Sequence, residues 1–411
     1  MADVKQQFIE YRDGLEIIYC HEHLTPEKKR LEREVDVLTL VSLYAWFDTV
    51  SAGLPAEGIA AGLDNYFLDT SVPLDERWKT VWPYLQRIKF GSYFRATAIT
   101  LRDIYGIDDL NEGTYREASE RIRAANKPGL FRKIFRDRCK IKTCLVQNEA
   151  KPEDQKPADL LTPVVSIKGC YDDPRSFAGF LGKEYDTSIG DLDTYLDALE
   201  RYLTFRHKRG DKGFKMSAQA FPAPDIGAAR KDFADALKDG PATPVLKATI
   251  LDMALRKAAE WDWPVPVHCG IWEDYRKIDP KNVIDMVQRY PGVRFDLYHL
   301  GMPFARDCIF IAKNFPNAYL NLCWCYVISQ EITRRTIGEI LDVVPVNKVF
   351  GFGGDYIWAV ENIYGHLTMA RETMAEALSQ RIAGGRLDVA GAEHIARLWL
   401  HDNPCSFYGL A

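Results

Sequence analysis

Residues 16–24 read Glu-Ile-Ile-Tyr-Cys-His-Glu-His-Leu, an apolar stretch that ends in two histidines separated by one residue. On an extended strand alternate side chains share a face, so His21 and His23 should point the same way. Two imidazoles on one face can reach a single metal ion at roughly 2.0–2.1 Å each. The spacing alone is a weak signal, because two ordinary histidines could produce it. Its weight comes from what lies further along the chain.

Three later apolar runs also end in a side chain that can bind a metal. His268 closes Val-Pro-Val-His, His299 closes Asp-Leu-Tyr-His, and Asp355 closes Val-Phe-Gly-Phe-Gly-Gly-Asp. The pattern of histidines and a carboxylate at the ends of separate strands predicts one divalent metal site. The remaining histidines fall in helical or loop contexts and are expected to be structural or exposed: His207, His366, His394 and His401.

Short β-rich runs alternate with helical stretches along most of the chain. Alternation of this kind predicts a parallel sheet with right-handed crossovers. The expected strands are residues 16–24, 142–147, 163–168, 214–219, 264–268, 294–299, 318–324 and 349–355. Eight such strands fit an α/β protein with a closed (β/α)8 barrel, in which functional groups gather at the C-terminal ends of the strands.

The first crossover is far too long for a single helix. Residues 25–138 look mostly helical and are rich in aromatic residues, so we expect a helical insertion that caps the mouth of the barrel. Most of these aromatic side chains should form the core of the insertion itself. The whole chain, residues 1–411, is then expected to be one barrel domain with this insertion.

Composition excludes several classes of function. The formal net charge is −5 and no long basic run occurs, so neither nucleic acid nor an anionic membrane is an expected partner. No apolar stretch reaches the roughly 18–20 residues that span a bilayer, and the polar N-terminus does not read as a signal peptide. The nine cysteines form no Cys-x-x-Cys pair and should be reduced. We expect a cytoplasmic protein with a small-molecule substrate. A homo-oligomer is compatible with the sequence, although nothing marks an interface.

With a histidine pair on the first strand, histidines on the fifth and sixth and an aspartate on the eighth, the sequence resembles the amidohydrolase superfamily. The resemblance implies a single divalent ion, with zinc expected and manganese as the alternative, held by His21, His23, His268 and Asp355. It also implies that His299 polarises a substrate carbonyl or a bound water.

Lys215, in Gly-Phe-Lys-Met-Ser on the fourth expected strand, lies where some members of that superfamily carry a carboxylated lysine that bridges two metals. A second metal is expected only if Lys215 is carboxylated. We favour an unmodified lysine that pairs with a substrate carboxylate or a neighbouring acid, because one metal needs only the other ligands.

A closer resemblance is to uronate isomerases and their relatives. Residues 82–85 (WPYL), 90–95 (FGSYFR) and 104–107 (IYGI) are similar to the insertion of those enzymes, and Tyr-Asp-Asp-Pro at 171–174 resembles their Thr-Asp-Asp-Pro turn. The eighth strand departs from the pattern. It continues Gly-Gly-Asp-Tyr-Ile-Trp where the isomerases have Thr-Asp-Ser-Arg, so the arginine is missing. His299, at the end of the sixth strand, is more typical of the hydrolytic and decarboxylating branches.

The first hypothesis is therefore a metal-dependent hydrolase of an amide, a lactone or a related bond in a small, carboxylate-bearing substrate. A bound metal can lower the pKa of water from about 16 to near 7. Asp355 would accept the proton of the attacking water, and His299 would stabilise the developing oxyanion. Decarboxylation remains open, as does aldose–ketose isomerisation of sugar acids. A non-catalytic binding barrel is a third hypothesis, but unpaired polar groups clustered in its mouth would cost stability.

Four residues are candidates for binding the substrate. Arg95 offers a bidentate fork for a carboxylate, with a surface arginine as the plainer interpretation. Lys168 should face the barrel mouth after the third strand, or else form a salt-bridged turn with the acids that follow. Trp324 and Tyr356 follow the seventh and eighth strands and should shape the pocket.

Overall fold

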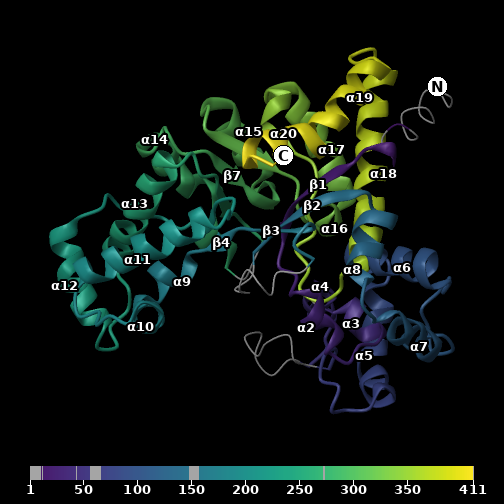
Figure 1. The fold of residues 1–411 in the computed structure, drawn as a ribbon. Coiled ribbons are helices and arrows are strands. Elements are labelled where there is room, and N and C mark those ends of the chain that lie inside the picture. The colour runs from purple at the N-terminus through teal and green to yellow at the C-terminus, as the bar shows by residue number, and fades with distance from the viewer. Residues whose placement is uncertain are drawn as a thin grey trace.

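The computed structural model describes residues 11–410, except 12, 43, 56–65, 148–156 and 272–273. Short strands lie at its centre and helices surround them (Figure 1). The strands are β1 (Ile17–Glu22), β2 (Ile141–Val146), β3 (Leu161–Pro163), β4 (Val165–Ser166), β5 (Phe214–Ser217), β6 (Val265–His268), β7 (Phe295–Leu297), β8 (Ala318–Asn321) and β9 (Val349–Phe350).

The strands pair in parallel and in sequence order, as the two sheets β1-β2-β3 and β4-β5-β6-β7-β8-β9. The predicted third strand is thus two short strands that are interrupted at Val164. The N–H of Val164 donates to the carbonyl oxygen of Val146 at 2.9 Å, whereas the N–H of Val165 donates to that of Gly213 at 3.1 Å. One extended segment therefore belongs to both sheets.

At the other end of the strand order, the backbone after β9 runs beside β1. The N–H of Cys20 donates to the carbonyl oxygen of Phe352 at 2.9 Å, and that of Gly354 donates to His21 at 3.1 Å. The last strand therefore lies next to the first, which is the order of a (β/α)8 barrel.

The predicted strands at the end of the chain run too long. β7, β8 and β9 all end earlier than expected, so His299 lies in the short helix η5 (Tyr298–Gly301), and Trp324 and Asp355 lie in loops. Their φ angles are 62°, 65° and 68°. A left-handed residue cannot continue a strand, and this is why the strands end earlier than their apolar patterns suggest.

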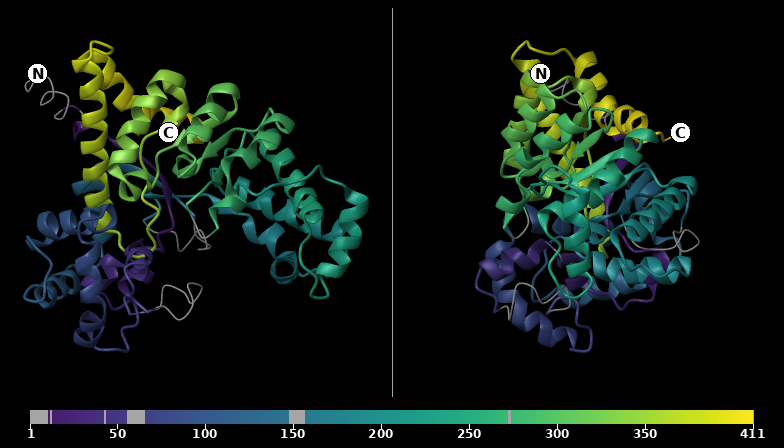
Figure 2. Two further views of the ribbon diagram at one scale, coloured as in Figure 1. Left: turned by 180° about the vertical axis from the view of Figure 1, so that it is seen from behind. Right: turned by 90° about the vertical axis from the view of Figure 1, so that its left-hand side faces the viewer.

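Helices fill the connections between the strands. Between β1 and β2 lie α2 (Glu27–Leu31), α3 (Val37–Val41), α4 (Tyr44–Ser51), α5 (Leu74–Ile88), α6 (Ser92–Tyr105), α7 (Tyr115–Ala125), α8 (Leu130–Arg132) and the π-helix η1 (Lys133–Arg138). Between β4 and β6 lie α9 (Lys168–Asp172), α10 (Pro174–Tyr185), α11 (Leu192–Lys208), α12 (Ile226–Ala236) and α13 (Pro244–Glu260). These two groups extend on opposite sides of the molecule (Figure 2).

The later connections are shorter. They contain η3 (Tyr275–Ile278), η4 (Pro280–Val283), α14 (Ile284–Arg289), η5 (Tyr298–Gly301), α15 (Ala305–Asn314), α16 (Cys325–Ile328), α17 (Gln330–Val343) and η6 (Val346–Lys348). After β9 come α18 (Asn362–Ala383), α19 (Val389–Arg397), the π-helix η7 (Leu398–Asp402) and α20 (Asn403–Tyr408). Within the described ranges, none of the helices has the length and apolar character needed to cross a membrane.

A buried ion pair ties the helices between β1 and β2 to the segment after β9. Arg30 of α2 donates to Glu361 Oε1 at 2.9 Å and to the carbonyl oxygen of Trp358 at 2.7 Å. Both charged side chains are fully buried. Losing one partner of such a pair leaves an uncompensated charge and costs about 3–5 kcal/mol. The segment that carries Asp355 is therefore anchored to α2.

Alternate strand residues pack on opposite sides of the sheets. One set joins the helices in the main core. The other forms a small cluster within the ring of strands: Ile18, Cys20, Leu145, Val164 and Phe350. Phe407 and Tyr408 of α20 pack on this cluster, and the Tyr408 hydroxyl donates to Asp296 on β7 at 2.5 Å. The C-terminal helix thus closes the floor of the ring.

Candidate metal centre

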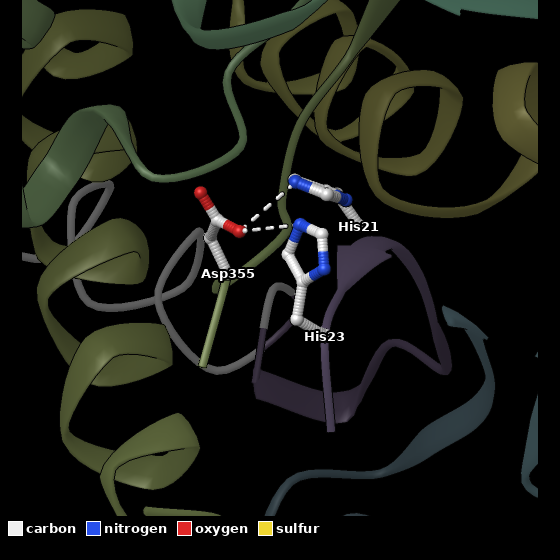
Figure 3. Close-up of side chains that lie close together, drawn as sticks. All are labelled: His21, His23 and Asp355. Atoms are coloured by element: carbon white, nitrogen blue, oxygen red, sulfur yellow. Dashed lines mark ion pairs between the residues drawn. The ribbon is translucent and has the colours of Figure 1, made fainter. Parts of the chain in front are cut away.

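Three of the predicted ligands come together where β1 ends and the loop after β9 begins. His21 Nε2 and His23 Nε2 lie 3.0 Å and 3.3 Å from the same carboxylate oxygen, Asp355 Oδ1 (Figure 3). Ligands held at about 2.0–2.1 Å in a tetrahedral site lie roughly 3.3 Å from one another. Two imidazoles and a carboxylate at this spacing therefore fit a zinc-like divalent ion.

The surroundings of the two histidines keep them in the form that binds a metal. His23 Nδ1 lies 3.1 Å from the carbonyl oxygen of Gln147 and donates to it, which leaves Nε2 free to face Asp355. Burial lowers the pKa of His23 to about 3, and the charge of Lys215 adds to the effect. The pKa of His21 is lowered well below its usual value, again chiefly by burial. Both imidazoles are therefore neutral at physiological pH, as metal ligands must be.

Lys215, on β5, lies within the same cluster. Its ammonium is 3.2 Å from His21 Nε2 and 3.3 Å from His23 Nε2. Burial lowers the pKa of Lys215 to about 8. A lysine at this position can act as a cation beside the ligands, and it is also close enough to carry a further ligand if carboxylated.

His268 and His299 form a second pair beside these residues. His268 Nδ1 lies 3.2 Å from His299 Nε2, and His299 Nε2 lies 3.8 Å from Asp355 Oδ2. His299 Nδ1 is held by the carbonyl oxygen of Cys323 at 3.1 Å. His268 Nε2 is buried and has no hydrogen-bond partner within the described part of the chain. The compact ligand group therefore comprises His21, His23 and Asp355, while His268 offers a free nitrogen next to it.

The backbone of Asp355 is held from two sides. The N–H of Asp355 donates to the carbonyl oxygen of His21 at 3.3 Å. The carbonyl oxygen of Asp355 accepts from the hydroxyl of Tyr44 on α4. The two preceding glycines leave no room for a side chain. A Cβ at Gly353 would lie 2.7 Å from Cys323 Cβ, and one at Gly354 would collide with the Tyr19 hydroxyl. The Gly-Gly-Asp sequence thus lets a crowded segment place its carboxylate at the cluster.

A cavity of about 920 Å³ opens beside the cluster. His23, Lys215, His268 and Asp355 contribute to its wall. Asp172 of the Tyr-Asp-Asp-Pro turn also lines it, as do residues that the sequence did not single out, among them Tyr44, Gln147, Gln219 and Lys247. They follow strands or sit on helices without any pattern that would mark them. The position of Gln147 directly after β2, at the same end of the ring as the histidines, is the one signal that could have identified it.

The predicted substrate-binding residues divide into two groups. Lys168 and Trp324 line the cavity, and the charge of Lys168 adds to the dominant effect of burial in lowering the pKa of His268 to about 4. Tyr356 is 3% exposed and does not contribute to the cavity wall. Its ring packs against that of Tyr44, with 5.5 Å between the ring centroids. Arg95 is 51% exposed and pairs with Glu372 at 2.8 Å and with Gln330 at 2.7 Å. These contacts support the surface interpretation of Arg95.

Comparisons with known proteins agree with this architecture. The sequence profile of a family described as amidohydrolase matches residues 134–410. The fold is similar to a uronate isomerase from Thermotoga maritima, with a TM-score of 0.80, 16% identity and coverage of 99% of this chain and 97% of that one. A glucuronate isomerase from Caulobacter crescentus gives a TM-score of 0.79, 15% identity and coverage of 99% and 94%. These structures confirm the predicted α/β fold class, the (β/α)8 barrel.

Similarity to a curated protein is narrower. The chain is 24% identical to the protein fluG of Emericella nidulans over 109 residues, which are 26% of this chain and 13% of that protein. The matched segment is thus a small part of a much longer protein.

Proposed function

Because this chain belongs to the amidohydrolase family, we propose that it is a metal-dependent hydrolase of a small, polar, carboxylate-bearing substrate. The observation that carries this proposal is the convergence of His21, His23 and Asp355 at the wall of a cavity large enough for a small molecule. Two neutral imidazoles and a carboxylate are suited to zinc, with manganese as the alternative. Such an ion would supply hydroxide near neutral pH.

The residues around the ligands have separate tasks in this proposal. Asp355 Oδ1 faces the two imidazoles, and its second oxygen, which lies 3.8 Å from His299, would accept a proton and pass it to the leaving group. His268, whose Nε2 is free, is the further candidate for holding the ion. His299 donates through Nδ1 to the carbonyl oxygen of Cys323, so its Nε2 would accept from His268 Nδ1 and orient the free Nε2 of His268 toward the ion.

Lys215 decides between one metal and two. As an ammonium beside His21 and His23 it would repel a second ion and attract the acid group of a substrate. We propose this unmodified form, with a single metal. Carboxylation of Lys215 would convert the cation into a ligand and allow a second ion.

Isomerisation of a sugar acid is the alternative function. The overall likeness to uronate isomerases and the residues of the insertion support it. One position argues against it. Ile357 lines the cavity where the isomerase pattern has an arginine, so the chain offers an apolar side chain in place of a guanidinium.

Isotope labelling separates the two functions. The metal-loaded protein would be incubated with lactones, amides and uronates in water enriched in oxygen-18, and the products analysed by mass spectrometry. A hydrolase incorporates one labelled oxygen per turnover. Conversion of a uronate into an isomer, with no net addition of water once carbonyl exchange in an enzyme-free control is subtracted, would replace the hydrolase proposal by the isomerase. The variant His23→Ala, treated in the same way, controls for spontaneous hydrolysis.

A further inference from the structure

One wall of the cavity carries an arrangement of charges that the metal chemistry does not use. Lys168 and Asp172 are four residues apart on α9 and therefore share a face of that helix. Lys247, on the neighbouring helix α13, donates to Asp172 Oδ1 at 2.7 Å. All three side chains line the cavity. Asp172 thus has a lysine from its own helix and a lysine from the next one within the same wall.

The position of Lys247 is fixed by a hydrogen-bond network. Gln219 donates through Nε2 to both carboxylate oxygens of Asp172, at 3.2 Å and 3.1 Å. Asp172, held in this way, anchors the ammonium of Lys247, and both side chains remain 23% exposed. An ammonium that is already ordered loses less conformational entropy when a ligand binds to it.

Lys168 differs from three of the other cations around the cavity, which have partners. Arg276 pairs with Asp274 at 2.7 Å, Lys247 pairs with Asp172, and Lys215 donates to the imidazoles. Lys168 is exposed to the cavity and forms no ion pair or hydrogen bond with any described residue. The same is true of Lys277, which lines the cavity on the short helix η3. Lys168 is thus a free cation beside an anchored one.

We propose that Lys168 and Lys247 form an acid-binding subsite, which holds the anionic group of the ligand on the cavity wall while the rest of the ligand reaches the metal cluster. The chemistry required is an anionic group with at least two oxygens, as in a carboxylate or a phosphate ester, because one oxygen can then meet each ammonium. Asp172 and Gln219 are positioning residues that keep Lys247 in place. The inference rests on the proposed function only in that the same cavity takes the substrate.

Matched probes test this subsite without requiring turnover. Isothermal titration calorimetry would compare D-gluconate, sorbitol 6-phosphate and sorbitol, which share a six-carbon polyol chain and differ in the acid group. We expect binding of at least one acid and none of sorbitol, and the tighter acid identifies a carboxylate or a phosphate as the preferred group. Equal binding of sorbitol and both acids would overturn the proposal.

Variants then separate the subsite from a general effect of charge. Lys168→Met and Lys247→Met should each weaken binding of the acid by about ten- to hundredfold, the usual effect of losing a hydrogen bond to a charged group. Lys168→Arg should retain most of the affinity. Lys277→Met removes the same charge from the same cavity and should change affinity by less than about threefold. Equal losses in Lys168→Met and Lys277→Met would contradict a specific subsite.

Metal dependence separates this inference from the proposed function. In the variant His23→Ala, whose fold would be checked by circular dichroism, the acid should still bind although metal is lost. Binding that disappears with the metal would show that the acid is held by the ion, and the subsite proposal would fall. Acid binding by the metal-loaded wild-type protein, together with a lack of any hydrolytic activity in it, would leave the subsite standing and reject the hydrolase.

Discussion

The two halves of the metal cluster are built on different backbones. His21 lies on the buried strand β1 and His23 directly follows it, whereas Asp355 lies in a loop and the neighbouring His299 lies in the short helix η5, with φ angles of 68° and 62°. A strand places alternate residues on one face through its own geometry. A left-handed residue other than glycine is unfavourable by itself and persists only when its surroundings hold it. The first half of the site is thus local, and the second depends on the rest of the molecule.

The contacts around Asp355 illustrate this dependence. Its carbonyl oxygen is held by Tyr44, from the helices between β1 and β2, and the segment that follows it is anchored through Arg30 and Glu361. The long connection after β1, which begins with His23, therefore supports the candidate metal site through Tyr44 and Arg30 as well. Substitutions in the histidine pair and in the segment around Asp355 should consequently have different effects on metal binding, turnover and stability.

The largest effect on metal binding and turnover is expected from a change at His21 or His23, the strand half of the cluster. His23→Ala removes one of two imidazoles that face the same carboxylate oxygen, so we expect bound metal and turnover to be abolished together. Inductively coupled plasma mass spectrometry on protein purified without chelators measures the metal, and the wild-type chain should carry about one ion. Full activity of the variant would rule out the proposed centre, and two ions per wild-type chain would point to a carboxylated Lys215.

In the loop half, Asp355→Asn should uncouple metal binding from turnover. Asparagine tolerates a left-handed backbone, so the loop should keep its shape and much of its metal. Loss of the proton acceptor should reduce kcat by about 10²–10⁴-fold. Measuring kcat beside metal content checks this, and a variant that loses metal as completely as His23→Ala would show that the two halves do not differ.

Crowding at the loop half predicts a loss of stability. Gly353→Ala would place a Cβ 2.7 Å from that of Cys323 and 2.9 Å from the backbone nitrogen of His21. We expect the free energy of unfolding to fall by about 1–3 kcal/mol, since overpacking forces backbone shifts. Urea denaturation measures it. Gly190→Ala is the matched control, because nothing lies within 4 Å of its added Cβ, and its stability should not decrease.

Lys215 predicts how metal affinity depends on pH. Burial lowers the pKa of Lys215 from 10.5 to about 8, so below that pH an ammonium faces His21 and His23 and opposes a divalent ion. Above it the amine is neutral and the repulsion is gone. We expect metal affinity to rise as the pH increases through about 8 and Lys215→Met to remove this step. Titrations with a metal indicator between pH 6 and 9 measure it, and an unchanged step in the variant would assign it to another group.

The smallest effect is expected far from both halves. Arg95→Ala removes a half-exposed pair with Glu372 that lies outside the cavity wall. An exposed ion pair contributes about 0–1 kcal/mol, and KM should not change. A rise of the steady-state KM by more than about threefold would instead show that Arg95, on α6, takes part in substrate binding.

The same comparison explains how far the sequence could be interpreted. The pair His21 and His23 could be predicted because period-two spacing on an apolar run fixes a shared face. The order of the strands was predictable because alternating strands and helices form a parallel sheet in sequence order. The left-handed conformations of His299 and Trp324 were not, because single non-glycine residues with positive φ leave no pattern in a sequence and are set by tertiary contacts. Lys247 was missed because its role depends on which helix packs beside α9.

Resemblance to a family had a similar limit. It indicated the fold and predicted ligand positions, of which His21, His23 and Asp355 lie together, but it did not indicate the direction of a side chain on a helix. Arg95 near the start of α6 was a candidate because a guanidinium can bind a carboxylate, but its guanidinium is engaged with Glu372 and Gln330, as the surface interpretation expects. Val164 is a second example of this limit. Its apolar neighbours predict a single strand, but the backbone N–H groups of Val164 and Val165 donate to different neighbouring strands.

The helix that closes the floor of the ring has a consequence for how the protein is made. Phe407 and Tyr408 pack under strands that include β1, so residues of β1 are covered by residues that the ribosome adds almost 400 positions later. A nascent chain that has completed β9 has all of its strands and still exposes the apolar interior of Ile18, Leu145 and Phe350. That surface is prone to aggregation until α20 arrives. The ring of strands can therefore be fully covered only after residues 403–408 have been synthesised.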